Sequence, residues 1–131
     1  MSRENVEVIR EVFRRGAEGD RMAVYDVLDP EVVWEVEFPV EGVHRGPEEV
    51  RRFFLEWVEA FEDYRAEAGE FIDAGEDVIV AVRHVAKGKT SGVDVDMQSF
   101  QVWTVRDGKV IRYRAFDVLE CLQHYSIPRN L

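Results

Sequence analysis

Cysteine is almost absent from this sequence, because Cys121 is the only one. A single cysteine excludes a disulfide within the chain, so the sequence predicts a reducing compartment, the cytoplasm. Cys121 lies in an apolar run near the C-terminus, where we expect a small buried hydrophobic side chain rather than a nucleophile. A disulfide-stapled scaffold and thiol chemistry are therefore both disfavoured.

Long apolar runs and an excess of basic residues are missing as well. No stretch approaches the roughly 18 consecutive apolar residues of a membrane span, and the first residues lack the apolar core of a signal peptide. The 17 basic residues are outnumbered by 27 acidic ones, which gives a formal net charge of -10. This balance argues against nucleic acid and against a membrane as partners.

Sequence motifs for cofactors and metals are also lacking. There is no phosphate-binding loop, no glycine motif for a dinucleotide and no nucleophile elbow. Asp94 and Asp96 share one face of a predicted strand, but no histidine or cysteine lies at a metal-ligand spacing from them. The sequence therefore predicts neither a metal site nor a cofactor.

The chain does contain the patterns of one α+β domain that covers residues 1–131. Helical spacing predicts a first helix ending at Gly19-Asp20, a short second one ending at Asp29-Pro30, and a third from Pro47 to about Phe61. The third helix carries a broad apolar stripe, which consists of Val50, Phe53, Phe54, Trp57, Val58 and Phe61. We expect these three helices to cover a sheet.

Alternating apolar residues predict the strands of that sheet. They lie at Glu31–Phe38, Arg65–Ala74 and Val78–Lys87, and a long hairpin follows from Val93 to Asp117. A short closing helix is predicted over Val118–Tyr125. The order of these elements predicts a strongly curved antiparallel sheet with the three helices on its concave face.

The hairpin turns at Asp107-Gly108, the strongest short-range hairpin signal in the sequence. A two-residue turn sets Tyr113 opposite Val102, whereas a three-residue loop with a glycine bulge sets it opposite Gln101. The sequence leaves both registers open. The choice matters because it decides which strand residues face the helices.

Several short motifs are spread along the chain, namely Gly19-Asp20, Leu28–Trp34, Arg45-Gly46-Pro47, Phe71–Gly75, Lys89–Gly92 and Arg106–Lys109. Together they resemble the SnoaL-like branch of the nuclear transport factor 2-like superfamily. The resemblance covers nearly the whole chain in the right order. It implies a cone-shaped fold that hosts isomerases, cyclases, epoxide hydrolases, dehydratases and non-catalytic binding modules.

The resemblance fits some activities of the superfamily better than others. Ketosteroid isomerases are similar up to a base near Glu35 or Glu37, but their oxyanion tyrosine and acid fall on Val12 and on about Phe100 or Gln101. Limonene-type epoxide hydrolases have Arg-x-Asp where this chain has Arg83-His84-Val85. In SnoaL-type polyketide cyclases the acid/base aspartate matches Asp117.

The candidate catalytic residues are therefore Asp117, His84 and Tyr113. The competing interpretations are that Asp117 only caps the last helix and that His84 is a hydrogen-bonded core residue. We expect Trp57 to be buried between core and pocket, at a cost of about 3–5 kcal/mol on truncation to alanine. The candidate ligand-binding residues are Trp34, Phe53, Trp57, Phe61, Phe100 and Phe116.

The sequence thus predicts a protein with a pocket for a small hydrophobic molecule. The first hypothesis is a cofactor-independent isomerase, cyclase or lyase that uses carboxylate acid-base chemistry. The alternative is a non-catalytic module for ligand binding or dimerisation. Because both faces of Val78–Val85 are apolar, we also expect a homodimer through the sheet.

Overall fold

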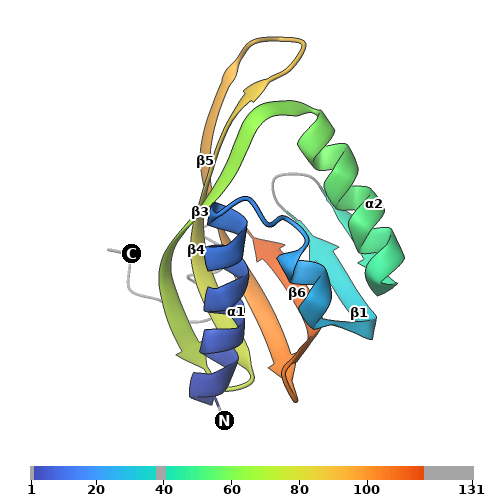
Figure 1. Cartoon of the computed structure of the whole chain (residues 1–131), viewed down its shortest axis with the longest axis vertical. Coiled ribbons are helices and arrows are strands. Elements are labelled where there is room, and N and C mark those ends of the chain that lie inside the picture. Colours follow the sequence, from blue (N-terminus) through green and yellow to red (C-terminus); the bar gives the residue numbers. More distant parts are fainter. Residues whose placement is uncertain (1, 38–40, 117–131) are drawn as a thin grey trace.

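The computed structural model describes residues 2–37 and 41–116 of the chain (Figure 1). Two α-helices and one 3-10 helix pack with six strands in a single curved sheet. The helices are α1 (Ser2–Ala17), η1 (Ala23–Val27) and α2 (Gly46–Glu59). The strands are β1 (Leu28–Val36), β2 (Gly42–Arg45), β3 (Phe61–Ala74), β4 (Asp77–Gly88), β5 (Asp94–Arg106) and β6 (Lys109–Phe116).

The strand order in the sheet is β2-β1-β6-β5-β4-β3. All neighbours are antiparallel except β1 and β6, which run parallel, so the prediction of a fully antiparallel sheet was wrong at this pair. Local sequence signals detect hairpins between consecutive strands, whereas β1 and β6 are far apart in the sequence and parallel neighbours are never joined by a hairpin. The sequence analysis also missed β2, a short edge strand that pairs with β1.

The helices are fewer than the three predicted ones. The second is the 3-10 helix η1, a single short turn, and the predicted closing helix at Val118–Tyr125 lies outside the described residues. Both α-helices pack on the same face of the sheet, where Ile9 and Val50 are each at most 1% exposed. Neither α-helix in the described ranges combines the length and the apolarity that crossing a membrane requires.

The β5–β6 turn is a two-residue turn at Asp107 and Gly108, with φ angles of 52° and 75°. Both residues have positive φ, as a type I′ hairpin turn requires. Arg106 pairs with Lys109, but a register shift follows, and Tyr113 then lies opposite Trp103. Neither predicted register is correct, because a bulge in β6 moves the pairing by one residue.

The two faces of the sheet carry separate apolar clusters. The inner face, beneath the helices, holds Val80, Val82 and Trp103 among its buried residues. The opposite face holds Ile79, Phe100, Val102 and Phe116. Alternation along each strand explains the division, since successive side chains point to opposite faces.

Candidate functional site

A cavity of about 770 Å³ lies between α1, β3 and the inner face of the sheet. A smaller space of about 60 Å³, called the recess below, continues beneath α2. The two share five wall residues, so they are neighbouring spaces of one site. The shared residues are Trp34, Phe54, Tyr64, Gln101 and Tyr113.

Three aromatic residues on adjacent strands form the floor of the cavity. Trp34 on β1 and Tyr113 on β6 are register partners, and their rings stack with centroids 3.7 Å apart. The ring of Trp103 on β5 contacts both rings edge-on, and its centroid is 5.4 Å from that of Trp34 and 4.8 Å from that of Tyr113. The bulge in β6 therefore has a direct consequence for the site, because it sets these rings side by side.

A chain of three polar side chains lies in the wall of the recess. The Tyr64 hydroxyl is 2.6 Å from Nδ1 of His84, and Nε2 of His84 is 2.9 Å from Oγ of Ser99. His84 is 6% and Ser99 is 2% exposed. Strand alternation places both on the inner face, His84 after Val82 on β4 and Ser99 opposite Val82 on β5. We call these three residues the relay.

An irregularity in β3 positions the tyrosine of the relay. The β3–β4 register shifts between Glu62 and Arg65, and Asp63 has a φ of 53° inside that segment. Such bulges bend a strand and change the direction of a side chain. An aspartate tolerates this left-handed conformation better than most residues do. The Tyr64 hydroxyl also has a hydrogen bond with Trp57 of α2.

Burial favours the uncharged forms of the two titratable residues of the relay, His84 and Tyr64. It lowers the pKa of the His84 imidazole below 6.5. It raises the pKa of the Tyr64 phenol to about 12, against smaller opposing effects of the Trp57 hydrogen bond and the Arg21 charge. Burial likewise raises the pKa of Tyr113. A neutral imidazole between two hydroxyls can accept a proton at one nitrogen and release one at the other.

The lowered pKa of His84 predicts that the protein loses stability on acidification. Between the folded-state pKa and the unfolded value of about 6.5, the unfolded chain binds a proton that the folded chain does not. The free energy of unfolding therefore rises with pH across this window. Urea titrations from pH 5 to 7.5 should show this slope in the wild type and a weaker one in His84→Gln. Equal slopes would contradict a buried neutral His84.

The structure brings five of the predicted site residues together. Trp34, Phe53, Trp57, His84 and Tyr113 all line the recess. Trp57 is only half-buried, which corrects the expectation that it would be a fully buried residue.

The other predicted site residues lie elsewhere. The ring centroids of Phe61 and Trp57 are 5.0 Å apart, but Phe61 lines neither the cavity nor the recess. Phe100 and Phe116 belong to the cluster on the opposite face, because strand parity turns them away from the helices. Asp117 lies outside the described residues, so its catalytic role stays a prediction.

Four residues of the relay and the cavity wall escaped the sequence analysis, namely Tyr64, Ser99, Gln101 and Trp103. Ser99 and Gln101 are polar residues at alternate positions of an apolar strand, and this pattern was an available signal. Gln101 accepts a hydrogen bond of 3.1 Å from the indole of Trp103. Tyr64 carried no comparable signal, because its direction depends on the β3 bulge.

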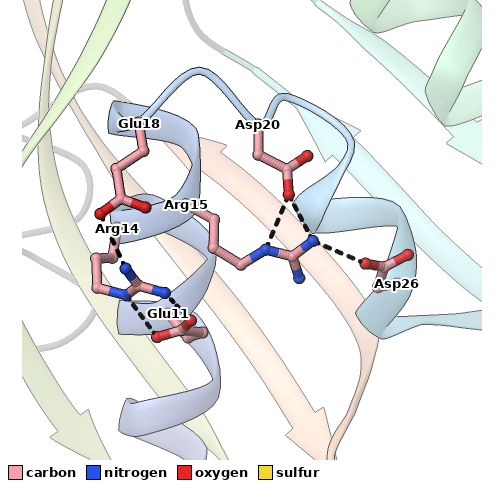
Figure 2. Close-up of polar contacts among 6 residues, drawn as sticks. All are labelled: Glu11, Arg14, Arg15, Glu18, Asp20 and Asp26. Carbon is pink, nitrogen blue, oxygen red and sulfur yellow. Dashed lines mark hydrogen bonds and ion pairs between the residues drawn. The ribbon is translucent and has the colours of Figure 1, made fainter.

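The charged residues of the cavity wall form a part that we call the entrance, in contrast to the aromatic floor. Figure 2 shows how ion pairs hold the C-terminal end of α1 there. Arg14 pairs with both Glu11 and Glu18, and Arg15 donates to Asp20 at 2.5 Å and to Asp26 at 3.1 Å. The Asp20 carboxylate also accepts the backbone N–H of Met22 at 3.2 Å. The charged residues that line the entrance are Arg10, Arg14, Asp20, Arg21, Arg65 and Glu67.

Solved structures with the same fold cover nearly all of this chain. An NTF2-like protein from Burkholderia thailandensis has 22% identity and a TM-score of 0.79, over 95% of this chain and 98% of its own. Bal32a, from a soil-derived mobile gene cassette, has 20% identity and a TM-score of 0.78, over 95% and 97%. TerC, co-crystallized with polyporic acid, has 22% identity and a TM-score of 0.73, over 91% and 95%.

Sequence comparison assigns the family directly. No curated protein matches the chain. The model of the SnoaL-like domain matches residues 9–113, which include the second half of α1, the three residues of the relay and the cavity floor up to Tyr113. The predicted α+β cone and the predicted resemblance are thereby confirmed at the level of family and fold. The chain belongs to the SnoaL-like domain family.

Proposed function

We propose that this protein is a cofactor-independent enzyme that moves a proton on a small, largely apolar organic molecule. The observation that carries the proposal is the relay, whose imidazole lies in the wall of the recess between two hydroxyls. A general base needs a pKa close to or below the working pH, so that it is unprotonated when the substrate arrives. The lowered pKa of His84 meets this requirement.

The shape of the site supports a substrate with an aromatic or other flat apolar body. Trp34, Trp103 and Tyr113 offer ring faces and edges to it. Such rings bind flat apolar molecules by burial and stacking. TerC, which shares the fold, was co-crystallized with polyporic acid. Isomerisation, cyclisation and elimination all need the proton transfer that the relay can supply.

Two further candidates complete the proposed set. Tyr113 keeps its proton, because burial raises its pKa, and is suited to donate a hydrogen bond to a developing oxyanion. Asp117 follows β6 directly in the sequence and is proposed as a second acid/base group. Replacing it by asparagine keeps its size and its ability to cap a helix, so any loss of turnover in Asp117→Asn would report proton transfer.

The experiment that tests this function is native mass spectrometry of the purified protein, followed by turnover of any molecule that copurifies. We expect one small organic molecule per chain. Its conversion should require no added metal or nucleotide. A molecule that binds and is returned unchanged would contradict the enzymatic proposal.

A ligand-binding module is the second candidate function. The observation that favours it is the internal satisfaction of the relay, since each nitrogen of His84 already has a protein partner. Fully paired polar networks often serve only to fix a core. If the protein only binds its ligand, His84→Gln should change the affinity for that ligand, and neither the wild type nor the variant should convert it.

A homodimer through the outer face of the sheet is the assembly that we propose. β4 carries apolar residues on both faces, and Ala81 and Val85 on the outer one are partly exposed. The exposed ion pair between Arg83 and Asp96, at 2.7 Å, lies on the same face and offers polar contacts. Sedimentation at micromolar concentration should give twice the 15.2 kDa of one chain. A monomer there would contradict the proposal.

A further inference from the structure

We propose that the ligand of the cavity is an amphipathic organic anion, whose acidic group binds Arg21 at the entrance. The inference rests on the proposed function, since it specifies the molecule that the cavity takes. Four arginines and two carboxylates line the entrance, whereas the chain as a whole has 17 basic and 27 acidic residues. Basic residues therefore outnumber acidic ones in the cavity wall, whereas acidic residues outnumber basic ones in the whole chain.

The four arginines differ in how far their charges are already compensated. Arg14 lies between Glu11 and Glu18, Arg10 is 3.5 Å from Glu7, and Arg65 is 4.0 Å from Glu67. Arg21 makes no ion pair with any described residue. It donates one long hydrogen bond, of 3.5 Å, to the backbone carbonyl of Tyr64. Among the entrance arginines it is therefore the one whose charge has no carboxylate partner among the described residues.

The two acidic residues of the entrance do not cancel this charge. The Asp20 carboxylate is taken by Arg15, which donates to it through Nε at 2.9 Å and Nη2 at 2.5 Å (Figure 2). The Glu67 carboxylate lies 3.7 Å from Arg83 and 4.0 Å from Arg65. An incoming anion would thus meet paired carboxylates and an unpaired guanidinium.

Arg21 is also close to Tyr64, the tyrosine of the relay. Its charge lowers the pKa of the Tyr64 hydroxyl, although burial has the larger, opposite effect. A molecule held by Arg21 with its apolar body over Trp34 and Trp103 would therefore extend along the side of the cavity that leads to the relay. A carboxylate, sulfonate or phenolate fits the planar donor set of a guanidinium.

Two fluorescent probes test the inference without a known ligand. 1-Anilinonaphthalene-8-sulfonate and N-phenyl-1-naphthylamine share one ring skeleton and differ in the sulfonate. Energy transfer from tryptophan reports binding at the site, because Trp34 and Trp103 line the cavity and Trp57 lines the recess. The variants are Arg21→Gln, Arg21→Lys and Arg52→Gln. Arg52 is an exposed arginine of α2 that lines neither space, so its loss matches the charge change elsewhere.

We expect the wild type to bind the sulfonate more tightly than the neutral probe. Arg21→Gln should weaken the sulfonate about tenfold, as expected for one charge-assisted hydrogen bond, and leave the neutral probe within about twofold. Arg21→Lys should restore part of the affinity, and Arg52→Gln should change nothing. Added salt should weaken only the sulfonate.

The two probes distinguish a failure of the inference about charge from a failure of the proposed function. If the neutral probe binds and Arg21→Gln affects neither probe, the cavity accepts apolar ligands but the inference about charge is wrong. If neither probe binds, the apolar pocket of the proposed function fails, and the anionic ligand fails with it. If Arg52→Gln weakens the sulfonate as much as Arg21→Gln does, the effect is one of net charge and Arg21 is not the site.

Discussion

Replacing Trp103 with alanine should lower the free energy of unfolding by about 3–5 kcal/mol, the usual range for a buried tryptophan. Trp103 is 3% exposed and lies at the centre of the aromatic floor, in edge contact with Phe13, Trp34 and Tyr113. The truncation removes these contacts and leaves Gln101 without the indole donor at 3.1 Å. A buried acceptor without its partner adds to the cost.

Trp57→Ala is the matched control, because it removes the same side chain from a half-buried position. We expect it to cost roughly 1–2 kcal/mol, in proportion to the smaller apolar area that it buries. Guanidinium titrations of both variants, with slopes compared to confirm two-state unfolding, measure the difference. An equal loss in the two variants would mean that Trp57 contributes as much to the core as Trp103 does at the floor of the cavity.

These two tryptophans show that sequence periodicity predicts a helix and its inward side but not how deeply each residue is buried. The apolar stripe correctly predicted a helix, from Pro47 to about Phe61, which the structure has at Gly46–Glu59. Phe61 itself is the first residue of β3. Periodicity does not say how much of the inward side the sheet covers. Val50, in the first turns, is 1% exposed, whereas Trp57, near the end, contacts the aromatic rings of Phe61 and Tyr64 at the edge of the recess.

Turn chemistry was similarly informative over short distances. Asp107-Gly108 forms the expected two-residue turn, since both residues tolerate positive φ. The bulge that follows has no comparable signature in the sequence of β6. One residue of shift is enough to decide that Tyr113 lies beside Trp103.

The relay was the least predictable part of the site. His84 was recognised as an unusual residue in an apolar strand, but its partners come from two other strands. Tyr64 reaches it through the β3 bulge, and Ser99 reaches it across the β4–β5 pairing. Such arrangements depend on register, which the sequence leaves open when both faces of a strand are apolar.

Replacing His84 with glutamine should reduce turnover by about 10²–10⁴-fold, the typical contribution of a general acid or base. Glutamine keeps a donor and an acceptor, so it can still bond to Tyr64 and Ser99, but it cannot accept a proton at neutral pH. The substrate for this assay is the molecule identified by native mass spectrometry. We expect the Michaelis constant to change little, because the loss affects the transition state rather than binding.

The pH profile separates catalysis from structure. In the wild type, kcat/KM should rise with pH through the lowered pKa of His84 and be level at neutrality, because the imidazole must be unprotonated to act as a base. His84→Gln should lose this rise. A purely structural histidine would instead leave the shape of the profile unchanged, and reduced activity would follow the fraction of folded protein.

Tyr64→Phe tests whether the three residues act together. It removes the hydroxyl that lies 2.6 Å from Nδ1 of His84 and leaves the aromatic contacts of the ring in place. If Tyr64 orients the imidazole, this variant should lose turnover as well, and the double variant with His84→Gln should be no slower than His84→Gln alone. Additive losses in the double variant would mean that Tyr64 and His84 act separately, and turnover at the wild-type rate in His84→Gln would remove the relay from the mechanism.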